Sequence, residues 1–342
     1  MRVVALVESE DHVCCRYRLA AFRDAFARAG HALHFQPLPR GPLGRLTIGR
    51  DLAAADAVIV QRKLLPRWAI ALLRRRVRRL IFDYDDAVWL RDSYSPRGFD
   101  DPKRLARFRA VVAAADVVVA GNTFLAGEAR QYTDPSRVLV IPTCVEPGKY
   151  PARAWSDLSA AGPHQPLRLV WVGSHSTLRG LERFAPTLAA IGRALPGTRL
   201  KLVCDRFLTI PDLTVDECPW HGDTEAAEIA AADVGIGWVP DDPWSRGKCG
   251  LKLLQYHAAG LPVVANPVGV QAEIVRDGET GFLATTSEEW VTAVARLAAD
   301  PYLRDRLGHA GRLQVEERYS VAAGAAAWLA ALDRVRPENA AA

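Results

Sequence analysis

Residues 248–270 read Lys-Cys-Gly-Leu-Lys-Leu-Leu-Gln-Tyr-His-Ala-Ala-Gly-Leu-Pro-Val-Val-Ala-Asn-Pro-Val-Gly-Val, which combines a helical segment, a helix stop and a strand. Gly260 suits the left-handed position after a helix, and Pro262 prevents the helix from continuing. Residues 263–265 have the apolar, β-branched character of a buried parallel strand. The next residues turn the chain where open parallel sheets bind ligands, beyond the carboxyl ends of the strands. We predict that the helix directs three polar side chains toward such a site: Lys248, Lys252 and Gln255.

Strand-like and helix-like segments alternate on both sides of this stretch, which indicates parallel sheets with helices on both faces. The expected strands cover 3–7, 33–35, 57–60, 80–83, 117–120, 138–141, 167–172, 200–203, 234–237 and 263–265. The main expected helices cover 16–29, 66–79, 103–115, 181–194, 225–231, 251–259, 288–299, 301–317 and 322–335.

The domain organisation follows from a break in this alternation. Residues 147–166 are rich in Pro and Gly and lack periodicity, as expected of a linker. We predict a Rossmann-like N-terminal domain over 1–150, a linker over 151–166 and a second Rossmann-like domain over 167–320. We expect the helix within 321–342 to cross back to the first domain before the tail.

Length and composition are those of an ordinary globular protein. A chain of 342 residues with 49% hydrophobic and 24% charged residues fits two α/β domains. The apolar run at residues 1–7 is too short for a signal peptide, and no run approaches the roughly 20 apolar residues that span a bilayer. The six cysteines lack metal-ligand spacing. We therefore expect reduced thiols and a cytoplasmic location, at most peripheral at the inner face of the membrane.

The positive charge is concentrated in the first part of the chain. Residues 1–150 contain 25 Lys and Arg against 16 Asp and Glu, a net charge of +9, while the remainder carries −4. This asymmetry predicts an anionic partner: nucleic acid, an anionic membrane or a phosphorylated acceptor. The basic groups lack aromatic interleaving on a recognisable nucleic-acid module, so we predict no nucleic-acid partner. Residues 62–79 form either a basic amphipathic surface for an anionic membrane or an exposed arginine-rich helix.

A second ligand-binding pattern occurs at residues 169–181, where a strand is followed by a Gly-Ser turn and a helix. The backbone amides of Gly173 and Ser174 would suit a diphosphate at the positive end of that helix. Arg179 would add a bidentate cation. The alternative is an ordinary strand-to-helix turn with a solvent-exposed arginine.

Carboxylates gather at the end of one strand of the first domain, in the sequence Ile81-Phe-Asp-Tyr-Asp-Asp-Ala-Val-Trp89. The pattern of Asp83, Asp85 and Asp86 could bind a metal ion. Asp85 could instead hydrogen-bond the acceptor or the donor sugar, cap a helix N-terminus, or form a structural ion pair with Arg16 or Arg18. Polar residues also follow the strands at 3–7 and 57–60, where an anionic acceptor would be held. These predicted acceptor-binding residues are Arg16, Arg18, Gln61 and Arg62.

Taken together, the segments 83–89, 232–236 and 248–270 resemble the family-4 type (group 1) of retaining GT-B glycosyltransferases, in particular a bacterial subgroup in polysaccharide and glycoconjugate assembly. The resemblance implies an α/β, GT-B fold with two Rossmann-like, doubly wound domains facing across a cleft. It implies a nucleoside diphosphate sugar as substrate, held mainly by residues 170–285, and a glycan, lipid-linked or small-molecule acceptor on the first domain. Transfer would retain the anomeric configuration, with the departing phosphate helping to deprotonate the acceptor. No metal and no separate cofactor are implied.

The resemblance also implies roles for individual residues. The family carries two glutamates eight positions apart, and this chain has Gly247 and Gln255 there, with Gln255 expected to contact the ribose. Asp85 stands where the family has a His. Catalytic roles are implied for Asp85, Asp86, Arg179 and Lys248. Donor-binding roles are implied for Gly173, Ser174, Arg179, Trp220, Lys248, Lys252, Gln255 and Glu273. Trp220 would either stack on the nucleobase or fill the core.

Two other classes of protein remain open at the level of sequence. Gly247 in place of a glutamate favours a non-catalytic GT-B protein that binds nucleotide sugars. A sugar-nucleotide epimerase would share the fold but would need acid–base histidines, and only His175 and His221 are candidates.

Overall fold

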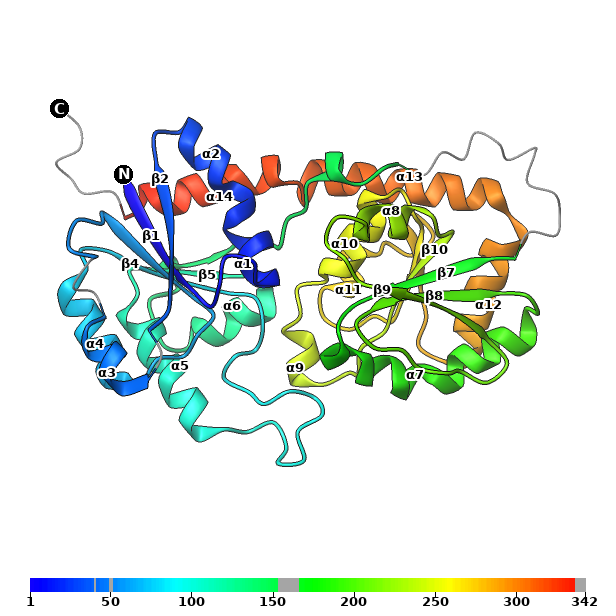
Figure 1. Cartoon of the computed structure of the whole chain (residues 1–342), viewed down its shortest axis with the longest axis horizontal. Coiled ribbons are helices and arrows are strands. Elements are labelled where there is room, and N and C mark those ends of the chain that lie inside the picture. The colour runs from blue at the N-terminus through cyan, green and yellow to red at the C-terminus, as the bar shows by residue number, and fades with distance from the viewer. Residues whose placement is uncertain (40, 49–51, 153–165, 336–342) are drawn as a thin grey trace. The chain divides into compact units, whose positions relative to one another are not determined.

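The structure, a computed structural model, describes residues 1–39, 41–48, 52–152 and 166–335. The chain divides into two units, which Figure 1 shows in full. Unit 1 contains Met1–Cys144, Asp242–Cys249 and the segment from Val321 onward, and unit 2 contains Val145–Asp241 and Gly250–Ser320. The predicted linker over 151–166 lies almost wholly outside the described residues.

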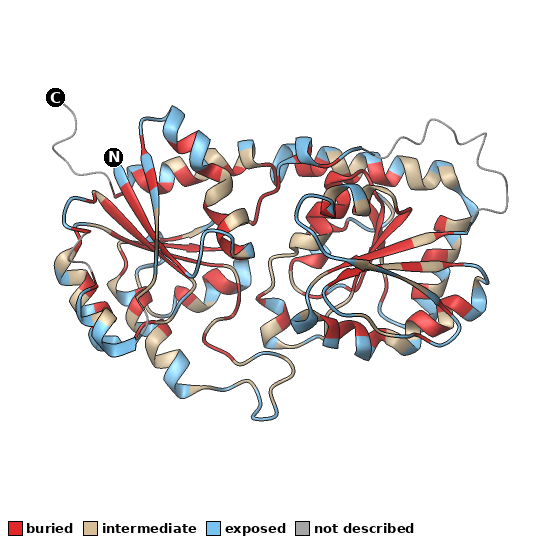
Figure 2. Cartoon of the chain, viewed as in Figure 1, coloured by how far each residue is buried: buried red, intermediate tan, exposed pale blue. Residues whose placement is uncertain are grey.

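Unit 1 is built on a parallel sheet with the strand order β2-β1-β3-β4-β5-β6. Its strands are β1 (Arg2–Val7), β2 (Ala32–Pro37), β3 (Ala57–Gln61), β4 (Leu80–Tyr84), β5 (Val117–Ala120) and β6 (Val138–Val140). Strands β1, β3, β4 and β5 are buried on both faces, as the red arrows of Figure 2 show, because alternate side chains enter two separate cores. Val4 and Leu6 enter one core, while Val3, Ala5 and Val7 enter the other.

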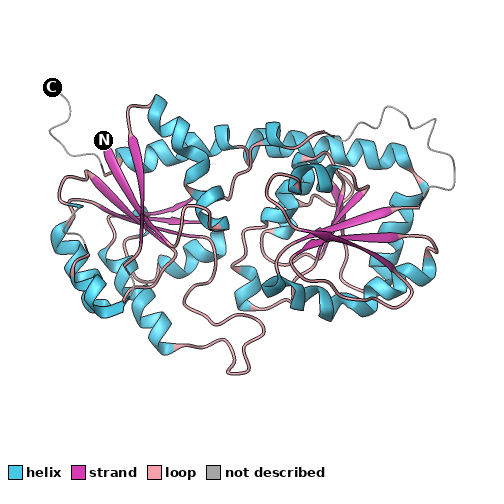
Figure 3. Cartoon of the chain, viewed as in Figure 1, coloured by secondary structure: helices cyan, strands magenta, loops and turns pink. Residues whose placement is uncertain are grey.

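Helices cover both faces of this sheet (Figure 3). The helices of unit 1 are α1 (Val13–Arg18), α2 (Arg23–Arg28), α3 (Gly41–Leu46), α4 (Arg67–Arg76), α5 (Pro102–Ala114), α6 (Thr123–Ala129), α9 (Pro243–Arg246) and α14 (Val321–Asp333). Helix α14 packs beside α2, where the Trp328 ring lies 6.2 Å from the rings of both Phe22 and Phe26. The C-terminal helix is therefore part of unit 1.

Unit 2 also contains a parallel sheet, with the order β12-β11-β10-β7-β8-β9. The strands are β7 (Arg168–Val172), β8 (Arg199–Cys204), β9 (Thr214–Pro219), β10 (Val234–Gly237), β11 (Val263–Ala265) and β12 (Gly281–Leu283). We did not predict β9 or β12 as strands. Strand β9 lies at the sheet edge and is half exposed, so it lacks an apolar run, and β12 is only three residues long.

The helices of unit 2 cover its sheet in the same way. They are α7 (His175–Ala194), α8 (Glu225–Ala230), α10 (Leu251–Ala258), α11 (Gln271–Ile274), α12 (Ser287–Ala299) and α13 (Pro301–Arg318). Gly260 has φ of 72°, as expected for the position after a helix. Helix α7 begins six residues before its predicted start. Ser174 caps it, with its backbone N–H donating to Thr177 Oγ1 at 3.2 Å, and the helix therefore includes Arg179.

The two strand orders determine where each sheet binds ligands. Numbered from β7, the sheet of unit 2 has the Rossmann order 3-2-1-4-5-6, whose direction reverses between β7 and β10. In unit 1 the reversal lies between β1 and β3. Ligands of open parallel sheets bind beyond the carboxyl ends of the strands at such reversals.

Candidate functional site

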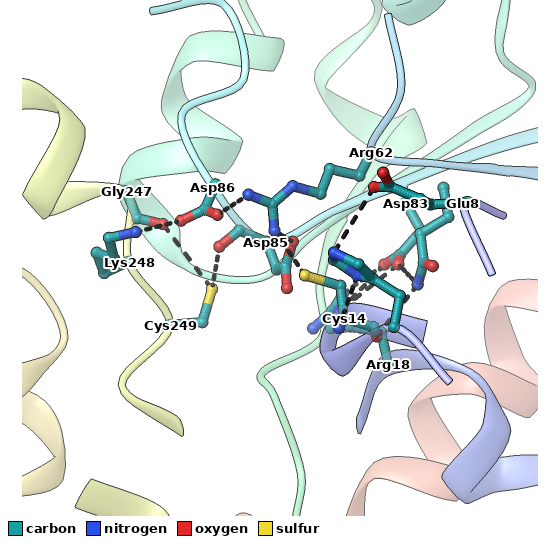
Figure 4. A network of polar contacts seen from close by, with 12 residues as sticks. Glu8, Cys14, Arg18, Arg62, Asp83, Asp85, Asp86, Gly247, Lys248 and Cys249 are labelled. Carbon is teal, nitrogen blue, oxygen red and sulfur yellow. Dashed lines mark hydrogen bonds and ion pairs between the residues drawn. The ribbon is translucent and has the colours of Figure 1, made fainter. Parts of the chain in front are cut away.

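The carboxyl ends of β1, β3 and β4 in unit 1 carry a connected network of charged side chains, shown in Figure 4. Gln61 and Asp83 are register partners at the ends of neighbouring strands. Gln61 is buried and donates to Asp83 Oδ2 at 3.3 Å and to the carbonyl of Cys14. Its amide therefore supports the network, which differs from the predicted acceptor contact.

Arg18 and Asp83 form a buried ion pair in this network. Their side chains are 1% and 0% exposed, with Nε and Nη2 of Arg18 at 3.2 and 2.5 Å from Oδ1 of Asp83. Burial raises the pKa of Asp83 even though Arg18 opposes that shift. The structure thus differs from the prediction that Arg18 contacts an acceptor, because the guanidinium is enclosed and also donates to the carbonyl of Ile141. Arg16, on the same helix, is only half-buried.

Arg62 is the centre of the network. Its Nη1 lies 3.3 Å from Asp85 Oδ1 and 2.5 Å from Cys14 Sγ, while its Nη2 pairs with Asp86. Burial alone would lower the pKa of Arg62, but the carboxylates of Asp86 and Asp85 raise it above its ordinary value. Arg62 has φ of 58°, a conformation that non-glycine residues rarely adopt. Such strain persists only where the surroundings fix it, and it is frequent at functional sites.

Asp86 joins this network to the segment Asp242–Cys249. Lys248 Nζ lies 3.2 Å from Asp86 Oδ1, and Cys249 Sγ lies 3.2 Å from the carbonyl oxygen of Asp85. Burial would raise the pKa of Asp86, but Lys248 and Arg62 together hold it below its ordinary value. Asp86 therefore stays a carboxylate between two cations.

The position of Lys248 corrects our prediction that it shares a helix face with Lys252. Gly250 has φ of 68° and α10 begins only at Leu251, so the left-handed residue separates the two lysines. Lys248 belongs to unit 1 and Lys252 to unit 2.

Gly247 is packed too closely for a larger residue. A Cβ atom there would lie 2.8 Å from both the Cβ and the backbone nitrogen of Ala87. The chain around it is fixed by Asn122, whose Nδ2 donates to the carbonyl of Lys248 at 3.0 Å, and by Ser93, whose Oγ donates to Asp242 at 3.1 Å. The family's glutamate is therefore incompatible with this packing.

In unit 2 the turn after β7 leads into the N-terminus of α7, where we expected a diphosphate. Asp205, which follows β8, accepts hydrogen bonds from the backbone N–H of His175 at 2.6 Å and pairs with its Nδ1 at 2.7 Å. The hydrogen bond with the His175 side chain is the main cause that lowers the pKa of Asp205 to about 2. Ser174 is exposed and its Oγ lies 2.8 Å from that of Ser176. An internal carboxylate thus already interacts with this helix end.

The cations of unit 2 are placed differently from those of unit 1. Arg179 is exposed on α7, and among the described residues no carboxylate lies within 4.0 Å of its guanidinium. Lys252 Nζ lies 4.0 Å from the centroid of the Trp171 ring. The Trp171 ring also packs against Gly173, where an added Cβ would meet it at 2.3 Å.

Gln255, Glu225, Trp220 and Tyr150 form a second polar network in unit 2. Gln255 Nε2 donates to Glu225 Oε2 at 2.9 Å and to Tyr150 Oη at 3.1 Å, and Trp220 Nε1 donates to Glu225 Oε1 at 2.7 Å. Trp220 is 40% exposed. It therefore does not fill the core, which was one of its two predicted roles. Glu273 is exposed on α11.

Two residues of the polar networks in unit 2, Glu225 and Asp205, were not predicted from the sequence. Glu225 reads as the first residue of an amphipathic helix, and Asp205 reads as a loop residue after a strand. The spacing from the Gly173 turn to the end of the next strand could have identified Asp205, because Rossmann folds place an acidic residue there. No local pattern indicates Glu225.

Most arginines of the predicted membrane-facing segment have partners within unit 1. Arg74 and Arg79 pair with Asp116, Arg78 pairs with Asp56, and Arg76 donates to the carbonyls of Leu46 and Ile48. Trp68 is exposed on the same helix. Along the described parts of the chain, no helix has the length and apolar character required to cross a membrane. Contact with a membrane surface stays a prediction.

Comparison with solved structures identifies the fold. The sucrose-phosphate synthase from Thermosynechococcus elongatus superposes with a TM-score of 0.74 at 19% identity, covering 98% of both chains. The structure of Anabaena Alr3699/HepE in complex with UDP-glucose gives a TM-score of 0.68 at 17% identity over 97% of this chain and 99% of that one. Together with the two Rossmann-like sheets, these similarities define an α/β protein of the GT-B fold.

Sequence relatives define the second unit more closely. Residues 149–300 match the family model described as "Glycosyl transferases group 1". The chain is 32% identical over 234 residues to a D-inositol 3-phosphate glycosyltransferase of Actinosynnema mirum, covering 58% of this chain and 54% of that protein. The chain thus spans about half the length of the curated relatives it matches first. Residues 149–300 therefore match a group 1 glycosyl transferase domain, within a chain of the GT-B fold.

Proposed function

We propose that this protein is a glycosyltransferase that moves a sugar from a nucleoside diphosphate sugar to an acceptor with retention of the anomeric configuration. One observation carries the proposal: the group 1 match at 149–300 falls on the unit with the Rossmann-order sheet, in which α7 and α10, the helices of Arg179 and Lys252, follow the two strands that flank the reversal, β7 and β10. A cation positioned at a departing phosphate stabilises the charge that develops during transfer.

Unit 2 binds the donor in this proposal. Arg179 and Lys252 contact the diphosphate and Gly173 allows its close approach, while Gln255 lies toward the ribose. Unit 1 holds the acceptor beside Asp85 and Arg16. Asp85 accepts a hydrogen bond from the acceptor or the reacting sugar, and the departing phosphate takes the acceptor proton. The aspartates of unit 1 are engaged by Arg18, Arg62 and Lys248, which supports transfer without a divalent metal, so activity should persist in EDTA.

We further propose that the acceptor is anionic. The net charge of +9 over residues 1–150 supports this, as do the names of two similar proteins, the D-inositol 3-phosphate glycosyltransferase and the sucrose-phosphate synthase, which both include a phosphate. A glycan or lipid-linked acceptor, approached from the inner face of a membrane, is the alternative, and Trp68 on the exposed side of α4 favours it.

Thermal-shift measurements with UDP, GDP, ADP and dTDP test the donor assignment. A true ligand at a hundredfold excess over its Kd stabilises the folded state by about 2.7 kcal/mol. If none of the four raises the melting temperature, the donor assignment is wrong. Hydrolysis of the matching nucleotide sugar then separates an enzyme from a non-catalytic binding protein, and anomeric analysis of the product distinguishes retention from inversion or epimerisation.

A further inference from the structure

The guanidinium of Arg62 projects from a backbone turn that an arginine rarely adopts. The residue directly follows β3 and has φ of 58°. Its N–H donates to the carbonyl of Asp83 at 2.7 Å. The N–H of Lys63 donates to the carbonyl of Gln61 at 2.6 Å, and Lys63 Nζ pairs with Glu8 at 2.6 Å. These contacts fix the turn on both sides of Arg62, which explains why its strained conformation persists.

The two terminal nitrogens of Arg62 bridge two neighbouring carboxylates, as Figure 4 shows. Nη1 lies 3.3 Å from Oδ1 of Asp85, and Nη2 pairs with Oδ2 of Asp86. The two carboxylate side chains are only 14% and 10% exposed, and like charges repel more strongly where little water screens them. A planar guanidinium can hold both carboxylates in one fixed geometry, which a single ammonium group cannot. Arg62 therefore determines how the two carboxylates lie relative to each other.

The two carboxylates differ in the number of cations that hold them. Asp86 also pairs with Lys248 through its other oxygen, at 3.2 Å, so both of its oxygens are engaged. Among the described residues, Asp85 pairs with Arg62 alone. Asp85 is thus the carboxylate with more capacity left to accept a hydrogen bond from a substrate. The direction of its side chain depends on a single cation.

Two cysteines next to Asp85 hold its backbone or carry no charge. Cys249 Sγ donates to the carbonyl of Asp85 at 3.2 Å, which fixes the main chain there. Cys14 Sγ lies 2.5 Å from Nη1 of Arg62. Burial raises the pKa of the Cys14 thiol well above its ordinary value, so the sulfur stays neutral. The backbone of Asp85 is therefore fixed without Arg62, whereas the direction and the charge balance of its side chain require Arg62.

We propose that Arg62 is a positioning residue of the transfer reaction, whose guanidinium holds the Asp85 carboxylate in the direction that the acceptor or the reacting sugar requires. Arg62 then acts through Asp85, which differs from the acceptor contact that we predicted from the sequence. The inference rests on the proposed function, because it assumes that Asp85 acts in the transition state. A group held in place in advance needs no reorganisation during the reaction. A misplacement of about 1 Å is enough to cost about 100-fold in rate.

Arg62→Gly removes the guanidinium and keeps the turn, because glycine adopts a positive φ without steric cost. Arg62→Asn is a second variant that also tolerates this backbone. The assay uses the full-length protein and follows hydrolysis of the nucleotide sugar that the wild type prefers among UDP-, GDP-, ADP- and dTDP-sugars. In both variants kcat should fall by about 10- to 100-fold, with the KM for the donor unchanged. Guanidinium chloride at millimolar concentration, far below denaturing conditions, should raise the kcat of Arg62→Gly, whereas sodium chloride at equal ionic strength should not.

A double-mutant cycle shows whether Arg62 acts through Asp85. In the Asp85→Asn protein, Arg62→Gly should lower kcat little further, because the carboxylate that it positions is already gone. The matched control is Arg91→Gly. Arg91 pairs with Asp101 at the same distance of 3.3 Å and is 17% exposed, and among the described residues it pairs with neither Asp85 nor Asp86. The kcat of Arg91→Gly should equal that of the wild type, with melting temperatures giving the folded fraction of every variant.

Four outcomes overturn the inference while the wild type is active: an unchanged kcat in Arg62→Gly and Arg62→Asn, an equal loss of kcat with and without Asp85→Asn, no effect of guanidinium on Arg62→Gly, or an equal loss in Arg91→Gly. Failure of the wild type to bind any nucleoside diphosphate and to turn over any nucleotide sugar is a separate result, which overturns the proposed function and this inference with it.

Discussion

The two strand-order reversals of this protein differ in whether their cationic side chains are paired with carboxylates. At the reversal of unit 1, Arg18, Arg62 and Lys248 are each paired with aspartates, and the pair between Arg18 and Asp83 is fully buried. At the reversal of unit 2, Arg179 is exposed, with no carboxylate within 4.0 Å among the described residues. Cations that are already paired shape a site and set its charge, whereas an exposed cation remains able to bind an anion from solution. This difference in pairing agrees with our proposal that unit 2 binds the phosphates of the donor and that unit 1 provides carboxylates that are already held in place.

The largest expected effect concerns the buried pair of unit 1. Arg18→Leu leaves the Asp83 carboxylate buried without its cation and should lower the free energy of unfolding by about 3–5 kcal/mol. Urea denaturation measures this loss. Arg193→Leu is the control in unit 2, because its pair with Asp212 is exposed and should contribute less than about 1 kcal/mol. If both variants lose the same free energy of unfolding, the buried pair of unit 1 contributes no more to stability than an exposed pair of unit 2.

Nucleotide binding provides the next largest contrast. Arg179→Ala and Lys252→Ala should each weaken nucleoside diphosphate binding by about 1.5–3 kcal/mol, since each removes a charge-assisted contact. Lys248→Ala, whose ammonium pairs with Asp86, should have a smaller effect on affinity. Calorimetry measures the loss of nucleoside diphosphate affinity in the three variants. A larger loss in Lys248→Ala than in the other two would indicate that unit 1 binds the phosphates.

The close packing at Gly247 tests whether unit 1 could accommodate the family's glutamate. Gly247→Ala should lower the free energy of unfolding by about 1–3 kcal/mol, because the new methyl group meets the backbone of Ala87. Gly127→Ala in α6 is the matched control. Its Cβ meets nothing within 4 Å, and a helical Gly→Ala change should stabilise by about 0.5–1 kcal/mol. Thermal or urea unfolding of both variants measures the difference, and a neutral Gly247→Ala would contradict the steric argument.

A substitution at Asp85 tests whether its carboxylate has a catalytic or a structural role. Asp85→Asn preserves shape but removes the charge 3.3 Å from Arg62. We expect kcat to fall about tenfold or more with little change in the KM for the donor, the pattern of a contact formed mainly in the transition state. A lower melting temperature with normal turnover of the folded fraction would instead place Asp85 in the scaffold.

The smallest effect concerns the internal carboxylate at the N-terminus of α7. His175 lowers the pKa of Asp205 to about 2, from an ordinary 3.8. Because the folded-state pKa is depressed, the stabilising contribution is present above about pH 4 and is lost as the pH falls toward 2. His175→Ala should return the pKa of Asp205 toward its ordinary value. Carboxyl-carbon NMR titration of the wild type and of His175→Ala measures the pKa of Asp205 in each. If the pKa is the same in both, the backbone N–H groups at the helix N-terminus, and not the His175 side chain, lower it.

Much of the fold follows from local patterns. The alternation of apolar strands and amphipathic helices predicted two parallel sheets, because strands buried on both faces must be apolar throughout. Gly260 and Pro262 ended α10 where expected. The same reasoning missed β9 and β12, since an exposed edge strand and a three-residue strand carry little periodic signal. It also merged α1 and α2 into one helix, although Leu19 leaves helical geometry between them.

The candidate sites separate what the sequence by itself determined from what the tertiary structure decided. The sequence placed Asp83, Asp85, Arg62 and Arg179 at strand or helix ends, because strand direction determines which edge of the sheet a polar residue reaches. It could not show that Arg18 selects Asp83 as its partner, that Lys248 belongs with Asp86, or that Glu225 holds Trp220. Those pairings join residues from 5 to 162 positions apart. They depend on distance and burial in the folded chain, and side-chain charge alone does not specify which opposite charge or donor lies within reach.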